Sequence, residues 1–170
     1  DYFAAHDLPA EACLGGMISL HFACYSGGTP ERDQYARMVK DLPDYSAQTP
    51  FIASLPRRML AHPNGGALAC LAHIDRIFTA SIDKTSRGPR YQPYRNLLFS
   101  LMRGKPVGHL NQHEFSRQAA QLGSTLYKLI ENGKIAGKAS GQELVPLWIA
   151  YNDASSFLVL GDPAARLRVD

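Results

Sequence analysis

Two short apolar runs stand out in the N-terminal half of the chain. Residues 17–24 (Met-Ile-Ser-Leu-His-Phe-Ala-Cys) are followed closely by the paired glycines Gly27 and Gly28, and residues 67–72 (Ala-Leu-Ala-Cys-Leu-Ala) end at His73. Short apolar runs bounded in this way are typical of strands buried on both faces of a parallel sheet. The pattern therefore predicts two parallel strands, joined by helices in a right-handed crossover.

Helical spacing of apolar residues, with proline near the start and glycine near the end, predicts helices on either side of the second strand. The expected helices cover residues 30–40, 50–62, 93–102, 142–153 and a longer stretch to about residue 132 that begins at Gly108 or Asn111, and a last strand covers residues 157–160. Pro56 should either bend its helix or mark its true first turn. The basic stretch 81–93 is predicted to be a loop. One α/β domain over residues 1–170, rich in helix toward its end, is expected.

Composition narrows the possible functions. The chain has 170 residues, 45% of them hydrophobic and 19% charged, and its net charge of +3 is too small to indicate binding to nucleic acid. The sequence contains neither a membrane-spanning run nor a signal peptide. Cys13, Cys24 and Cys70 lack metal-ligand spacing, so free thiols in a reducing cytoplasm are expected. No metal or cofactor is predicted.

Cys24 is the main candidate for chemistry. It falls at the carboxyl end of the first predicted strand, the edge where open α/β sheets carry their ligands and reactive groups. Gly27 and Gly28 would let a substrate backbone approach, and N–H groups around the turn could stabilise an oxyanion. The alternative is a small hydrophobic side chain buried in the core, as most free cysteines are.

A nucleophilic thiol needs a base, usually histidine. His73 ends the neighbouring strand, so it could lie beside Cys24, or it could be a polar loop residue. His21 is expected on the opposite face of the strand from Cys24, and His6 also stays possible. His109 and His113 could share a helix face and bind a metal, but no third ligand is evident.

The segment Phe22-Ala23-Cys24-Tyr25-Ser26-Gly27-Gly28 resembles the nucleophile segment of caspase-fold cysteine peptidases. The bacterial CHAT-like and gingipain-like branch of that clan is the most similar. Further segments resemble successive blocks of this branch: residues 2–8, 28–30, 66–73, 103–108, 151–153 and 160–163. Together they extend over nearly all of the chain.

This resemblance implies a three-layer α/β/α sandwich with a mainly parallel sheet. It also implies an endopeptidase with a Cys–His dyad, in which Cys24 forms a thioester with the substrate. Residues Gly27, Gly28, His73 and Asp75 are then expected at the oxyanion and substrate sites. In the family the histidine belongs to a His-Gly pair that ends the strand before the nucleophile strand, and no such pair occurs in these 170 residues.

The base is therefore expected before Asp1, on an N-terminal remainder of the same domain, with His6 and His73 as substitutes within the chain. Metacaspases hold an Asp two residues before the cysteine, to pair with a basic substrate side chain, whereas this chain has Phe22. Asp75 could instead form an anionic floor of the specificity pocket, or simply pair with Arg76 in a loop.

Two other functions stay open at this point. The chain could be a catalytically inactive caspase-like module that serves as a protein-interaction scaffold. It could also be a different thiol enzyme on a doubly wound sheet, such as an amidotransferase, although that reading calls for a His and an acidic residue together downstream of Cys24.

Overall fold

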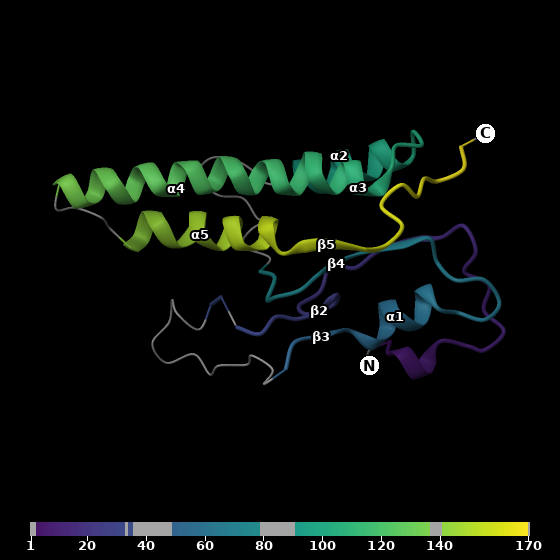
Figure 1. Ribbon diagram of the computed structural model, residues 1–170. Coiled ribbons are helices and arrows are strands. Elements are labelled where there is room, and N and C mark those ends of the chain that lie inside the picture. The colour runs from purple at the N-terminus through teal and green to yellow at the C-terminus, as the bar shows by residue number, and fades with distance from the viewer. Residues whose placement is uncertain (1–2, 33, 36–48, 79–90, 137–140, 170) are drawn as a thin grey trace.

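The computed structural model describes residues 3–32, 34–35, 49–78, 91–136 and 141–169 (Figure 1). The strands are β1 (Ile18–Leu20), β2 (Gly28–Thr29), β3 (Phe51–Ile52), β4 (Ala69–His73) and β5 (Phe157–Gly161). The helices are α1 (Ser54–Leu60), α2 (Gln92–Leu101), α3 (Val107–Asn111), α4 (Arg117–Ala136) and α5 (Gly141–Ser155), with a 3₁₀ turn η1 (Ala5–Asp7) and a π-helical segment η3 (Gln112–Ser116). The described residues thus form a mixed α/β structure.

The main sheet has the strand order β1-β4-β5. β1 runs parallel to β4, with Leu20 opposite Leu71, which confirms the predicted parallel pair. β5 runs antiparallel to β4, with Phe157 opposite His73, so the sheet is mixed. The sequence pattern did not predict this direction, because a short apolar run has no signal for the orientation of its partner. β2 and β3 form a separate antiparallel pair.

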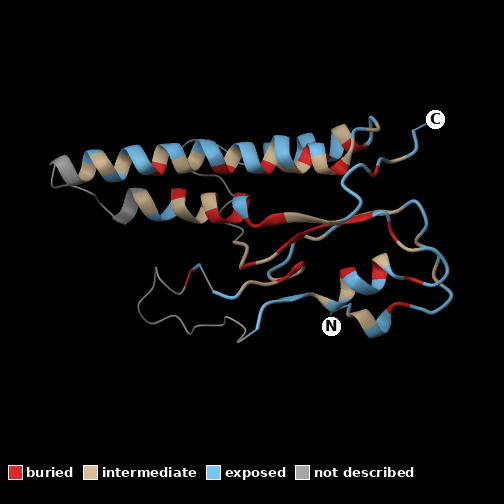
Figure 2. Ribbon diagram, in the orientation of Figure 1, coloured by how far each residue is buried: buried red, intermediate tan, exposed pale blue. Residues whose placement is uncertain are grey.

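β4 is the central strand, and all five of its residues are buried, as Figure 2 shows. Its alternate side chains enter two different clusters. Ala69 and Leu71 belong to the cluster formed with α2, α3, η3 and β5. Cys70 belongs to a second cluster with Met59 of α1 and Leu8 beside η1. Helical elements therefore pack against both faces of β4, because successive side chains of a strand point to opposite faces.

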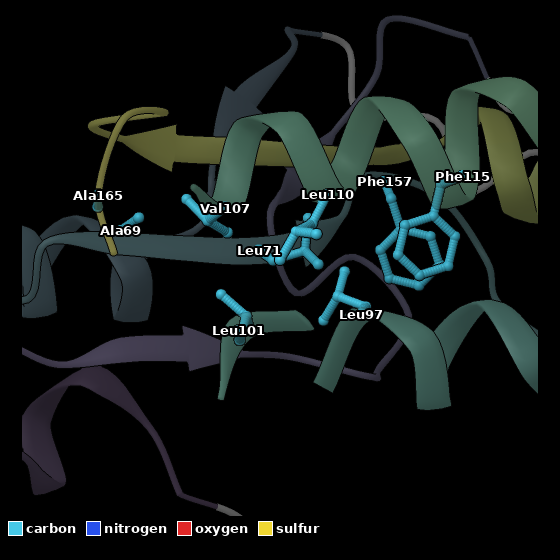
Figure 3. Packing of buried hydrophobic residues seen from close by; sticks show 9 residues of the cluster. All are labelled: Ala69, Leu71, Leu97, Leu101, Val107, Leu110, Phe115, Phe157 and Ala165. Atoms are coloured by element: carbon cyan, nitrogen blue, oxygen red, sulfur yellow. The ribbon is translucent and has the colours of Figure 1, made fainter. Parts of the chain in front are cut away.

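The larger cluster contains stacked aromatic rings (Figure 3). The ring of Phe115 in η3 stacks on that of Phe157 in β5, with 4.2 Å between the ring centroids. Tyr94 of α2 packs edge-on against both rings. These contacts attach α2 and η3 to the end of the sheet at which β5 begins.

The C-terminal half is rich in helix, as expected. α3, η3 and α4 follow one another without a break, and the predicted long helix begins at Val107, close to the expected Gly108. α4 and α5 pack side by side as a long antiparallel pair that extends beyond the sheet (Figure 1). Pro146 lies inside α5.

The prediction of a strand over residues 17–24 buried on both faces is wrong. Only Ile18–Leu20 form the strand, and none of these three residues is buried. Leu20 and Phe22 are 39% and 44% exposed. The interior strand predicted from this run is therefore an edge strand in the described part of the sheet.

The prediction of a helix over residues 30–40 is wrong for the residues that the structure describes. Residues 30–32 and 34–35 are not helical, and residues 33 and 36–40 lie outside the described part. The physical reason is pairing, since Thr29 extends along Phe51 in the β2–β3 ladder instead of capping a helix.

The second predicted helix is shorter than expected and begins at Ser54. Pro56 falls in the first turn of α1, where its missing N–H leaves no hydrogen bond unmade, and this confirms one of the two roles predicted for it. The predicted basic loop 81–93 lies outside the described residues except for its last three, and α2 already begins at Gln92. No described helix combines the length and the apolar character that crossing a lipid bilayer requires.

Candidate active site

Cys24 lies in a turn directly after β1, at the carboxyl end of that strand, and it is exposed. Its Sγ contacts the backbone of Ile77, 3.4 Å from the nitrogen and 3.5 Å from the oxygen. The alternative of a small hydrophobe buried in the core is therefore wrong.

The turn around Cys24 is tight. The N–H of Ser26 donates to the carbonyl of Ala23 at 3.3 Å, and the N–H of Gly28 donates to that of Tyr25 at 3.2 Å. Tyr25 has a φ of +55°, in the left-handed region that non-glycine residues rarely adopt. Such a conformation costs about 1–3 kcal/mol and is held only where neighbouring contacts enforce it. The residue directly after the thiol is thus locally strained.

Contacts to the end of β4 hold this turn in place. The N–H of Tyr25 donates to the carbonyl of Asp75 at 3.0 Å, and that of Gly27 donates to the carbonyl of His73 at 2.8 Å. The hydroxyl of Ser26 accepts a hydrogen bond from the N–H of His73 at 3.1 Å. The turn that contains Cys24 is therefore hydrogen-bonded to the end of β4, a strand whose residues are all buried.

The N–H groups of this turn differ in their availability. Those of Gly27 and Gly28 are used in the backbone bonds just described, so neither is directed at a substrate. Among the described residues, no backbone carbonyl accepts a hydrogen bond from the N–H of Cys24. Of these three backbone N–H groups, that of Cys24 is therefore the one available to donate a hydrogen bond to an oxyanion.

His73 lies in the core rather than beside the thiol. Its side chain has no exposed surface, and its ring packs edge-on against Phe157. Nδ1 lies 2.7 Å from the carbonyl oxygen of Asp75, and Nε2 lies 3.2 Å from that of Asp153. With both ring nitrogens against backbone groups, His73 positions the end of β4 and does not contact the sulfur of Cys24.

Asp75 is also fully buried. Its carboxylate accepts hydrogen bonds from the backbone N–H of Arg76 at 2.6 Å and from that of Gln34 at 3.4 Å. Arg76 in turn donates from Nε to the hydroxyl of Tyr25 at 3.0 Å. In this arrangement Asp75 shapes the loop after β4, and it does not form an exposed floor for a cationic side chain.

The hydrogen bonds and contacts of His21, His62 and His6 are to groups other than the thiol. The ring of His21 bonds to the hydroxyl of Ser19, and burial lowers the pKa of His21. His62 bonds to the carbonyl of Pro9 at 2.9 Å, and His6 lies against a neighbouring carboxylate at the surface. All six histidines belong to the described part of the chain, and no hydrogen bond there joins any of them to Cys24.

His109 and His113 share a helix face as expected, with 5.8 Å between their ring centroids. His113 contacts Glu114 at 3.1 Å and Arg117 at 3.4 Å. Among the described residues, no group of three or more His, Cys, Asp or Glu side chains is placed to hold a metal ion.

One part of the site could not be read from the sequence. Asp153, near the end of α5, is buried, and its carboxylate accepts hydrogen bonds from the hydroxyl of Tyr35 at 2.8 Å and from the N–H of Phe78 at 3.3 Å. Burial, with a smaller contribution from the charge of Asp153, raises the pKa of Tyr94. Tyr35, Phe78 and Tyr94 lie 59 to 118 positions from Asp153 in the sequence, so no local spacing could have revealed that they come together.

An open apolar pocket of about 420 Å³ lies beside the start of the Cys24 turn. Leu20 and Phe22 form one side, and Tyr94 and Leu98 of α2 form part of the other. The ring of Phe22 packs edge-on against that of Tyr94, with 5.4 Å between centroids. The pocket therefore lies between the edge strand and α2.

Comparison with known proteins does not identify this chain: no family model, no curated protein and no solved structure matches it.

Proposed function

We propose that this chain is the nucleophile-bearing part of a caspase-like cysteine endopeptidase. The observation that carries the proposal is the exposed thiol of Cys24 at the carboxyl end of β1, on a strained turn held by the buried strand β4. Strain beside a reactive group and a rigid support beneath it are common features of catalytic sites. The resemblance of residues 22–28 to the nucleophile segment of caspase-fold peptidases supports the same role.

In the proposed reaction, the Sγ of Cys24 attacks the carbonyl carbon of the scissile peptide bond. The N–H of Cys24 stabilises the negative charge that develops on the carbonyl oxygen. The C–N bond then breaks, and the amine leaves with the proton taken from the thiol, which yields a thioester. Water hydrolyses the thioester and regenerates the thiol.

The general base is proposed to be a histidine from outside these 170 residues, on an N-terminal remainder of the same domain. Within the chain, His73 is enclosed by backbone groups and His6 lies at the surface against Asp7. Neither contacts the sulfur of Cys24, which favours an external base over either substitute.

The proposed architecture is the three-layer α/β/α sandwich of the caspase fold. Two features support it: the parallel pair β1–β4, and the packing of helical elements against both faces of β4. A cytoplasmic location belongs to the same proposal, because all three cysteines are free thiols. A peptide or protein substrate is expected.

A second candidate, a catalytically inactive scaffold module of the same fold, is favoured by one observation. No histidine of the chain contacts Cys24, although all six are described. The two candidates differ in whether the thiol reacts as a nucleophile.

The test uses the protein made from its complete reading frame and a thiol-reactive peptide probe. We expect covalent labelling at Cys24, complete loss of labelling in Cys24→Ala, and unchanged labelling in Cys13→Ala, whose thiol is also exposed. Labelling that persists in Cys24→Ala would rule out the proposed nucleophile. A protein that takes up no probe would support the scaffold module instead.

A further inference from the structure

A polar pocket of about 220 Å³ opens on the continuous helix that α3, η3 and α4 form. Four exposed side chains line it: His109, Gln112, His113 and Arg117. Among the residues described around this pocket there is no Asp or Glu, and none of them belongs to the turn of Cys24. The lining is therefore rich in hydrogen-bond donors and holds no anionic group of its own.

The π-helical segment η3 aligns three of these side chains. His109, His113 and Arg117 follow one another at intervals of four residues. In an α-helix with 3.6 residues per turn, the first and last of three such positions point about 80° apart. A π turn closes its hydrogen bonds from i to i+5 and so contains more residues, which reduces this angle. The irregular segment thus directs the three side chains toward one pocket.

Glu114 lies next to the lining, but its carboxylate is already engaged. Oε1 lies 3.1 Å from Nδ1 of His113, and Oε2 accepts a hydrogen bond from the side-chain amide of Asn96 in α2 at 3.2 Å. Because a carboxylate accepts, Nδ1 of His113 is the donor. Nε2 then accepts from Arg117 at 3.4 Å. Glu114 therefore holds the ring of His113 with Nε2 directed toward Arg117.

Much of the donor capacity of the lining is unused. In the described part of the chain, the side chains of His109 and Gln112 make no hydrogen bond or ion pair. Arg117 makes the one long bond to His113. A guanidinium has five N–H donors, and an imidazole donates from both nitrogens once it is protonated. The pocket can therefore present several donors and a positive charge to one ligand.

We propose that this pocket binds a phosphate group. The guanidinium of Arg117 pairs with two phosphate oxygens, the geometry for which its planar fork is suited. Nε2 of His113, protonated from solvent, donates to a third oxygen while Nδ1 keeps its bond to Glu114. His109 and Gln112 complete the donor set. The inference does not depend on whether Cys24 is a catalytic residue.

Two other ligands fit less well. A transition-metal ion would need Nε2 of His113, which faces the cationic Arg117, and the described residues offer no group of three His, Cys, Asp or Glu to hold it. A carboxylate has a single charge and two oxygens. A phosphate monoester has a charge of about −1.5 to −2 and three strong acceptor oxygens, so it uses more of the available donors.

The experiment is isothermal titration calorimetry at constant pH and ionic strength, on the protein made from its complete reading frame. Inorganic phosphate and phenyl phosphate are the two probes, and acetate is the comparison. We expect saturable binding of phosphate and binding of acetate at least tenfold weaker. Tighter binding of phenyl phosphate would assign the site to a phosphate ester, and tighter binding of inorganic phosphate would assign it to the free ion.

Three variants locate the site. Arg117→Gln should weaken phosphate binding at least tenfold. His109→Gln should weaken it at least threefold, and it breaks no hydrogen bond of the described protein. Lys128→Gln is the matched control, because it removes one positive charge from an exposed position of the same helix outside the pocket. Its affinity for phosphate should equal that of the wild type.

Three results would overturn the proposal: no saturable binding of either phosphate at millimolar concentration, acetate bound as tightly as phosphate, or the same loss of affinity in Lys128→Gln as in Arg117→Gln. The last result would show a general effect of net charge instead of a site. Circular dichroism spectra that match wild type verify that the variants are folded.

Discussion

At the scale of single residues, the turn that follows β1 is defined by atoms that meet from distant parts of the sequence. The sulfur of Cys24 rests on the backbone of Ile77, and the N–H groups of Tyr25 and Gly27 bond to the carboxyl end of β4. Apart from the sulfur itself, these contacts use main-chain N–H and C=O groups, which every residue type except proline has. A substitution near the site therefore acts mainly through the backbone conformation that it permits.

Gly28 illustrates this dependence. Its φ is +146°, and a Cβ there would overlap the carbonyl oxygen of Phe51 in the neighbouring strand. We expect Gly28→Ala to lower the free energy of unfolding by about 1–3 kcal/mol, because β3 must move to admit the methyl group. Urea denaturation followed by circular dichroism measures the change.

Gly15→Ala is the control for this substitution, since a Cβ at Gly15 meets no atom within 4 Å. It should leave the denaturation midpoint close to that of the wild type. Equal midpoints for both variants would show that β2 and β3 do not approach each other as closely as described.

At the scale of elements, α2 has two unlike faces. Leu97 and Leu101 enter the larger cluster, whereas Leu98, Phe99 and Met102 stay exposed. The solvent-exposed face of a surface helix is usually polar. Clustered apolar side chains on that face are typical of an interaction site. The element therefore contributes both to the core and to the pocket beside β1.

This division makes a prediction about two adjacent leucines. Leu97 is 2% exposed and Leu98 is 49% exposed. Leu97→Ala should destabilise the protein by about 2–5 kcal/mol, because it leaves a cavity in the packed cluster. Leu98→Ala should change stability by less than about 0.5 kcal/mol. Thermal or urea denaturation compares the two, and similar losses would contradict the assignment of the faces.

At the scale of the whole molecule, the reactivity of the three cysteine thiols depends on whether the protein is folded. Cys13 and Cys24 are exposed, whereas Cys70 lies in β4 with no exposed surface, and burial raises the pKa of its thiol. Because the thiolate is the reactive form, both effects slow the reaction of Cys70 in the native protein. The native state should therefore expose two of its three thiols to a reagent.

The number of accessible thiols is measured at pH 8 with an aromatic disulfide that releases a coloured thiolate when it reacts. We expect two thiols to react at once and the third to react only when the protein is unfolded in denaturant. Cys70→Ala should keep the two fast thiols and lose the slow one. Immediate reaction of all three thiols in the native protein would contradict the central, covered position of β4.

The sequence by itself determined those elements whose signal is local. The buried strand β4, the parallel partner β1, the helices α2 and α5 and the first-turn position of Pro56 were all predicted, because apolar periodicity and proline act over a few residues. The position of Cys24 at the carboxyl end of its strand was predicted from the same pattern, whereas the choice between an exposed and a buried thiol was left open and the structure decided it.

Only the tertiary structure decided how these elements meet. It paired Thr29 with Phe51 directly before the residues where a helix was expected, and it enclosed His73 and Asp75 among backbone groups instead of opening them to a substrate. The antiparallel direction of β5 was decided in the same way. The physical reason is that strand pairing and burial depend on partners tens of residues away in the sequence. The local amino-acid composition does not specify which residues those partners are.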